Sequence, residues 1–408
     1  MSGEGRITYT AGLLVVENFC SINLIFGFIM RRINYFLMCL ALITGFACKE
    51  PYKPTIISSP NAYLVIEGVL NAGAGPTNIR LTRIFKLDDT ARLKGELNAQ
   101  VVVEGKDNTT RPLTMDGDGF YVSPNLNLTL NQEYRIRIMT ANGKEYLSDY
   151  VVAKKTPVID SVGWEREDKG VQVYVNAHDA SNNTQYYRWD YDETWEIRSY
   201  YDSEFKYVNG VVIKRTPTEG VYYCWKYDRS SDILLGSSAR LASDIITRAP
   251  IAFFGTGDEK LAVRYSILLR QYALDKTGYE FYEIMKKNTE SLGTIFDAQP
   301  SEMRGNIRCT SDPEEVVIGY ISAATIEEKR IFISGLDLPR WNFYQDCPEI
   351  LVRNHPDSIQ DAYAGGGSIY SAVFSPANPN IITYYKASIS HCVECPKRGG
   401  SLVRPSYW

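Results

Sequence analysis

The chain has 408 residues, enough for two or three domains, and its 44% hydrophobic and 23% charged residues are typical of a globular protein. A net charge of −4 argues against a nucleic-acid-binding protein, which normally presents a basic surface. Three histidines stand beside 29 tyrosines and 6 tryptophans, so candidate general bases and metal ligands are scarce and aromatic rings abundant.

The N-terminal region resembles a bacterial lipoprotein signal. Met30 is followed by two arginines and then by an apolar run over residues 35–46, which has the length of a signal-peptide core and is too short to span a membrane as a helix. The run ends in small residues before Cys48. We therefore interpret residues 30–47 as a lipoprotein signal peptide and expect Cys48 to carry the lipid. A plain secretory signal or an N-terminal membrane anchor are the alternatives, and residues 1–29 are interpreted as a mis-annotated upstream extension.

Residues 48–60 contain three prolines and predict an extended tether. Glu50, just after the lipidated cysteine, resembles a weak form of the surface-export signal of Bacteroidota lipoproteins. We therefore expect a protein that is anchored by its lipid in the outer membrane and exposed at the cell surface.

Residues 61–155 alternate between apolar and polar positions, with turn sequences in between, which predicts an N-terminal Ig-like β-sandwich. In the clearest strand Tyr134, Ile136 and Ile138 share one face. The turn at residues 116–119 (Asp-Gly-Asp-Gly) could suggest calcium, but the further oxygen ligands of a calcium loop are not placed near it, so we interpret it as a hairpin turn. The predicted strands cover residues 63–69, 78–85, 100–104, 120–122 and 134–138.

Residues 156–338 predict a second β-rich domain. Its longest alternating run places Tyr187, Trp189, Tyr191, Trp195 and Ile197 on one face, as expected of a strand in a sandwich core. The polar interval 202–221 predicts a long loop. Further strands are predicted over residues 171–175, 263–273, 316–321 and 330–333.

One helix is predicted near residues 275–292, as an insertion in the second domain. Asp275 can cap it, and Phe281, Ile284, Met285 and Asn288 follow at helical spacing. Residues 339–408 are rich in glycine and proline and predict an irregular C-terminal segment packed on the second domain. The predicted fold class is therefore mainly β, with two β-sandwich-like domains in tandem and a disulfide-tied C-terminal tail.

Five cysteines follow the predicted lipidation site, and in an oxidising compartment we expect them to form disulfides. They are Cys224, Cys309, Cys347, Cys392 and Cys395. Five thiols cannot all pair within one chain. We expect Cys347 to pair with one cysteine of the Cys392/Cys395 pair, and Cys224–Cys309 is the second candidate.

A zinc site formed by Cys347, His391, Cys392 and Cys395 is the alternative, because CxxC is a common half of such a site. We do not favour it, since only one CxxC is present and an oxidising compartment does not suit thiolates. No metal or cofactor is therefore predicted.

Aromatic residues that break the alternation beside the polar interval are the candidate ligand contacts: Tyr200, Tyr201, Phe205 and Tyr207. The chain contains no G-x-S-x-G, H-E-x-x-H or phosphate-loop motif. We therefore predict no catalytic residue and a non-enzymatic protein. The sequence does not identify its ligand.

Several segments together resemble the Bacteroidota outer-membrane lipoprotein family called domain of unknown function 4249. They are Cys48, residues 264–274, residues 305–309, the Cys392–Cys395 motif, and Gly399, Gly400, Pro405 and Trp408. The resemblance implies an accessory role beside a TonB-dependent outer-membrane transporter, in substrate capture or uptake. The alternatives are a structural or assembly component of the cell envelope and, more weakly, a glycan or peptide hydrolase.

Overall fold

The computed structural model describes residues 63–84, 94–290, 305–338, 343 and 345–408. The predicted upstream extension, signal peptide, Cys48 and tether lie outside these residues. Within them, no helix combines the length and the apolar character needed to cross a membrane.

The first group of strands forms an extended sheet assembly around one hydrophobic core. Its hydrogen-bonded order is β19-β8-β7-β4-β5-β6-β2-β1-β20, and the strands predicted between residues 63 and 138 are all present. The turn at residues 116–119 joins β5 to β6, with the Asp116 amide donating to the Phe120 carbonyl at 2.8 Å, so the predicted hairpin turn is confirmed. The consecutive strands are β1 (Tyr63–Asn71), β2 (Thr77–Ile84), β3 (Lys94–Gly95), β4 (Gln100–Gly105), β5 (Thr110–Met115), β6 (Phe120–Ser123), β7 (Glu133–Met139), β8 (Glu145–Ser148) and β9 (Val151–Val152).

Three short strands from much later in the chain complete this first assembly: β19 (Ile307–Cys309), β20 (Val317–Gly319) and β21 (Ser322–Ala324). β20 and β21 pair in parallel with β1, and β19 pairs with β8. The strand predicted over residues 316–321 therefore exists in part, but its hydrogen bonds join it to the first assembly and not to the second domain.

The second group consists of two sheets that share one core. One sheet has the order β10-β11-β17 and the other β15-β12-β18-β22, with β16 also paired to β12. Tyr187, Trp189, Tyr191, Trp195 and Ile197 all lie in this core, so the predicted core stripe is confirmed. The strands are β10 (Ile159–Glu167), β11 (Gly170–His178), β12 (Tyr186–Arg198), β15 (Tyr223–Arg229), β16 (Leu234–Ser237), β17 (Ile245–Gly255), β18 (Arg264–Leu274) and β22 (Ile326–Ser334).

The predicted helix is α2 (Lys276–Glu290). The Asp275 carboxylate accepts from the Gly278 amide at 2.7 Å, so Asp275 caps the helix as predicted. The Tyr320 hydroxyl donates to the same carboxylate at 2.8 Å, which links the start of the helix to the segment after β20. The end predicted near residue 292 lies outside the described residues.

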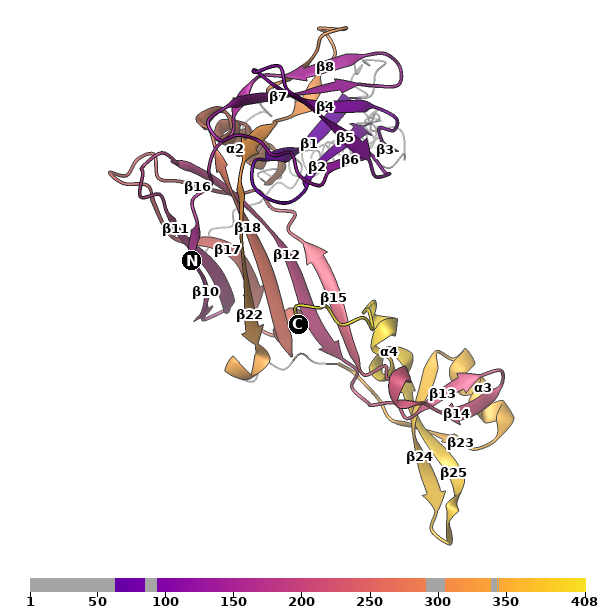
Figure 1. Cartoon of the computed structure of the whole chain (residues 1–408). Helices are drawn as coiled ribbons and strands as arrows, with labels where there is room; N and C mark the ends of the chain where they lie inside the picture. Colours follow the sequence, from indigo (N-terminus) through magenta and orange to yellow (C-terminus); the bar gives the residue numbers. More distant parts are fainter. Residues whose placement is uncertain (1–62, 85–93, 291–304, 339–342, 344) are drawn as a thin grey trace, which may run out of the picture. The chain divides into compact units, whose positions relative to one another are not determined.

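The C-terminal segment differs from the irregular tail that the sequence predicts. It contains a three-stranded sheet of order β23-β25-β24, and its core also includes Phe205 from the interval predicted as a long loop (Figure 1). That interval folds into the β13–β14 hairpin. The elements are β13 (Phe205–Val208), β14 (Val211–Lys214), β23 (Ile350–Arg353), α3 (Pro356–Ala364), β24 (Gly367–Ser375), β25 (Asn378–Ile389) and α4 (Ser390–Val393).

Short one-turn helices connect these strands: η1 (Pro217–Glu219), η2 (Glu259–Leu261), η3 (Gly335–Asp337) and η4 (Cys395–Arg398). The predicted mainly β class is confirmed. Several of the residues that suggested an irregular tail lie at strand boundaries: Gly365, Gly366 and Gly367 join α3 to β24, and Pro376 lies in the turn after β24.

Candidate functional site

Two disulfides fix the C-terminal segment. Cys347 pairs with Cys392, which confirms the favoured prediction, and Cys224 pairs with Cys395. The predicted Cys224–Cys309 pair is therefore wrong. Cys309 is a free, buried cysteine on β19, in the core of the first assembly, whereas Cys224 belongs to the core of the second. The disulfides also use all three thiols that the zinc alternative required.

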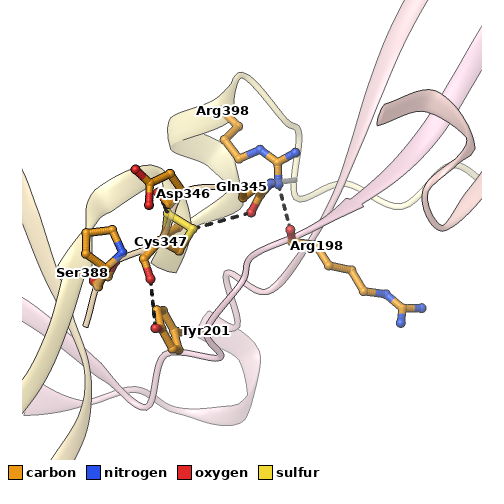
Figure 2. Close-up of a disulfide and its surroundings, with 9 residues drawn as sticks. Arg198, Tyr201, Gln345, Asp346, Cys347, Ser388 and Arg398 are labelled. Atoms are coloured by element: carbon orange, nitrogen blue, oxygen red, sulfur yellow. Dashed lines mark hydrogen bonds between the residues drawn. A yellow bond between two sulfur atoms is a disulfide. The ribbon is translucent and has the colours of Figure 1, made fainter. Parts of the chain in front are cut away.

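The Cys347–Cys392 disulfide is directly connected to two of the candidate contact residues. The Cys392 carbonyl accepts from the amides of Tyr200 and Tyr201, at 2.8 and 3.0 Å. The Tyr201 hydroxyl donates to the Cys347 carbonyl at 3.1 Å (Figure 2), and its ring stacks on Tyr370 with centroids 4.1 Å apart. The backbone that carries Tyr200 is thus tied to a covalently closed loop.

The four candidate contact residues have different environments. Tyr200 is 59% exposed, whereas Phe205 is buried in the C-terminal core and unavailable to a ligand at the surface. Tyr207 stacks on Tyr363 with ring centroids 4.4 Å apart, and Tyr201 stacks on Tyr370. Of the four, Tyr200 lines the hollow described next.

This hollow has a volume of about 360 Å³, at the lower end of the range for small-molecule sites. Four separate parts of the chain form it: the end of β12 with the two residues that follow it, η2 with the residues between it and β18, Phe343 with Gln345, and η4. We call it the η2/η4 hollow. It is lined by Glu196, Ile197, Arg198, Ser199, Tyr200, Glu259, Ala262, Val263, Phe343, Gln345 and Arg398.

A network of buried charges lies on one side of the hollow. Arg398 forms an ion pair with Glu259, whose other carboxylate oxygen accepts from Lys226 at 2.8 Å. Arg398 also donates to the Arg198 carbonyl at 2.8 Å (Figure 2), and the Gln345 amide lies within hydrogen-bonding distance of both its terminal nitrogens. Burial lowers the pKa of Arg398, and burial together with the neighbouring Arg398 charge lowers the pKa of Lys226.

Arg198 and Glu196, both near the end of β12, also line the hollow. Arg198 Nε donates to one Glu196 oxygen at 2.9 Å, and the Trp408 indole donates to the other at 3.3 Å. The Arg198 guanidinium lies over the ring of Tyr223, 5.2 Å from its centroid. Its two terminal nitrogens have no partner in the described part of the chain, and Figure 2 shows the side chain turned away from Arg398.

The two carboxylates of the hollow are already hydrogen-bonded. Each oxygen of Glu196 and Glu259 accepts from one side chain. Among the residues that the structure describes, no group of three or more His, Cys, Asp or Glu side chains could hold a metal ion.

Of the residues that line the hollow, Tyr200 was named from the sequence, but Glu259 and Arg398 were not. These two residues are 139 positions apart and meet where η4 is tied to β15 through Cys395 and Cys224. The polar face of β12 did contain a signal, since Glu196 and Arg198 alternate with the core stripe. Nothing in the sequence indicated what would lie opposite them.

Solved structures with detectable similarity share little sequence with this chain. A putative carbohydrate binding protein from Bacteroides uniformis ATCC 8492 is 12% identical, covering 53% of this chain and 91% of that chain, with a TM-score of 0.15. CBD12 from CALX1.2 is 11% identical, covering 66% and 99%, with a TM-score of 0.12. TM-scores this low support no argument about fold or function, and no curated protein matches the chain.

The sequence itself gives a specific match to a protein family. The family model described as Domain of unknown function (DUF4249) matches residues 49–330. The match includes two of the segments named above, residues 264–274 and 305–309, whereas the Cys392–Cys395 motif lies beyond it. Because the matched residues make up more than half of the chain, this protein belongs to the DUF4249 family.

Proposed function

We propose that this DUF4249 protein is a non-catalytic, lipid-anchored protein of the outer membrane that captures a ligand for a TonB-dependent transporter. The η2/η4 hollow carries the binding part of this proposal, because exposed Tyr200 lies there beside a fixed set of charges. The anchoring part rests on the signal-like sequence that ends at Cys48. The transporter is proposed from the family resemblance.

The state of the carboxylates favours capture over hydrolysis. A glycosidase needs one carboxylic acid that can protonate a leaving group and one carboxylate that can attack or activate water. Glu196 and Glu259 are both in the hollow, but each is held by two donors. They support the shape and charge of a binding site better than an acid–base pair.

A role as an assembly component is the second candidate, and the C-terminal sheet favours it. Leu351, Phe374, Ile381 and Tyr384 are each more than 40% exposed there, and exposed apolar residues of this kind are common at protein interfaces. The capture function depends on the η2/η4 hollow and the assembly function on the exposed residues of the C-terminal sheet, so the two can be tested separately.

The capture proposal is tested by ligand screening with two matched variants. Tyr200→Ala removes the exposed ring of the hollow, and Tyr384→Ala removes a similarly exposed ring on β25, outside the hollow. We expect a library of oligosaccharides and short peptides to contain compounds that raise the melting temperature of the wild type and of Tyr384→Ala but not of Tyr200→Ala. Equal responses from both variants would contradict a binding site in the hollow.

The partner is tested by affinity purification of the anchored, tagged protein after cross-linking in intact cells. We expect mass spectrometry to identify a TonB-dependent transporter with the wild type and equally with Tyr200→Ala, because the ring binds the ligand and not the transporter. Loss of the transporter in a variant of Leu351, with Tyr200→Ala unaffected, would identify the C-terminal sheet as the contact. Recovery of envelope assembly proteins alone would support the second candidate.

A further inference from the structure

Among the charged side chains that line the η2/η4 hollow, the polar atoms without a partner in the described residues are donors. All four oxygens of Glu196 and Glu259 already accept from a side chain. In contrast, the terminal nitrogens of Arg198 have no partner among the described residues, although a guanidinium offers five N–H donors. A ligand that complements this site must therefore supply acceptors.

The charge balance of the hollow points in the same direction. The charged residues that line the hollow, Arg198, Arg398, Glu196 and Glu259, balance one another, and Lys226, which bonds Glu259 from outside the lining, adds a third cation. The side chains of this network thus leave one positive charge in excess, within a chain whose net charge is −4. The guanidinium that keeps free donors is that of Arg198, whose side chain is 46% exposed, so an anionic ligand can reach it directly.

Aromatic surface lies next to the free guanidinium. Tyr200 and Tyr223 are 59% and 50% exposed, and Phe343 is 36% exposed. Tyr200 and Phe343 line the hollow, while Tyr223 lies beneath Arg198 and holds its guanidinium in place. Exposed rings of this kind offer flat apolar faces, so the ligand should combine an acidic group with a flat apolar face of its own.

We propose that the η2/η4 hollow binds a carboxylate-bearing sugar, a uronic-acid residue of an oligosaccharide. Arg198 donates two parallel N–H bonds to the sugar carboxylate, the geometry in which a guanidinium binds a carboxylate best. Tyr200 packs against the C–H face of the ring. This assignment names the ligand class of the capture function proposed above and rests on that function.

An acidic peptide fits the site less well, because the backbone around the hollow is already paired. Peptides that bind as an added strand rely on free main-chain groups. The Ser199 amide donates to Tyr222, the Tyr200 amide donates to Cys392, and the Val263 carbonyl accepts from Gly335. Recognition in this hollow must therefore use side chains.

The test compares three probes by calorimetry: trigalacturonate, its methyl ester, and triglutamate. We expect trigalacturonate to bind at least tenfold more tightly than its ester, with an affinity that falls as salt is added. Arg198→Gln should remove most of this preference, and Arg198→Lys, which keeps the charge but not the paired donors, should remove part of it. The control is Arg353→Gln, which removes an exposed arginine of β23 outside the hollow and should leave both affinities unchanged.

The outcomes separate this inference from the capture function. Equal binding of the ester and the acid would overturn the acidic-sugar assignment while leaving capture in the hollow supported. Tight binding of triglutamate alone would also overturn it, in favour of an acidic peptide. If no member of the wider library binds, the capture function itself fails together with this inference. An unchanged melting temperature of Arg198→Gln confirms that any loss of binding is local.

Discussion

Glu315 shows how one buried carboxylate joins distant parts of the chain. Its side chain is 2% exposed and accepts from Lys144 at 2.5 Å, from Tyr146 at 2.7 Å and from Arg83 at 3.1 Å. Lys144 and Tyr146 flank the start of β8, and Arg83 lies on β2. The carboxylate therefore holds the late segment 305–324 against strands that precede it by more than 150 residues.

Replacing Glu315 by glutamine should destabilise the protein by about 2–3 kcal/mol at neutral pH, because two cations and a hydroxyl lose a charged acceptor. The measurement is urea unfolding of the wild type and the variant. Glu314→Gln is the matched control, since Glu314 is exposed. An equal effect of the two substitutions would contradict a specific role of Glu315.

The same network makes a prediction about pH. Burial alone would raise the pKa of Glu315, but the hydrogen bonds from Lys144, Tyr146 and Arg83 outweigh burial and hold the pKa below its ordinary value of 4.5. A lowered pKa means that the stabilisation is complete above pH 4.5 and is lost as the pH falls through the lower folded value. The difference in unfolding free energy between wild type and Glu315→Gln should therefore shrink in acid.

At the scale of elements, the parallel pairing of β1 with β20 depends on one glycine. Gly319 has a φ of +147° and faces Ile66 in the register of the two strands. A Cβ atom added to Gly319 would lie 2.2 Å from the Ile66 carbonyl oxygen. Both the conformation and the close approach therefore require glycine.

Gly319→Ala should destabilise the protein by at least about 1–3 kcal/mol, the usual magnitude for a side chain forced into an unfavourable backbone region. Thermal unfolding measures the loss. The control is Gly163→Ala on β10, where an added Cβ would meet no atom within 4 Å and the φ angle is ordinary. If both variants melt at the same temperature, the close approach at Gly319 is unimportant for stability.

The sequence predicted the strands whose partners follow them closely, because alternation in a half-buried strand is a local property. It placed residues 316–321 in the wrong sheet, because the partner of β20 is β1, more than 240 residues earlier. Three-residue strands are also too short to show a period. The C-terminal sheet was missed because its core is completed by Phe205, which lies in a different part of the chain.

The candidate site could be predicted only in part, for the same reason. Tyr200 could be named because it departs from the alternating pattern just after β12 ends. Arg398 and Glu259 could not be identified from the sequence, because no local pattern indicates that η4 and η2 lie together in the fold. The positions of the cysteines along the chain were enough to predict that Cys347 pairs with the CxxC motif. The partner of Cys224 could not be predicted in this way, because it depends on which hydrophobic core contains each cysteine.

For the molecule as a whole, the membrane anchor is the prediction with the simplest test. Cys48→Ala should abolish labelling with a radioactive fatty acid, because no neighbouring residue offers a thiol that can accept the lipid. The variant should also be released from the membrane fraction. Cys309→Ala is the control, because that cysteine is buried on β19 and should not affect labelling. Label retained in Cys48→Ala would exclude the lipoprotein assignment.

The order of the cysteines along the chain constrains how the protein can be made. Cys224, Cys309 and Cys347 are all synthesised before Cys392 and Cys395, yet both native disulfides need one of those last two residues. An oxidase that joined thiols as they appeared would first produce the non-native Cys224–Cys309 bond. Cys309 is buried in the core of the first assembly, so folding of this assembly protects it from forming the non-native bond. This protection begins once residues 305–324 have paired with β1 and β8. We therefore expect native oxidation to be most efficient when the first assembly folds before the C-terminal module is covalently closed.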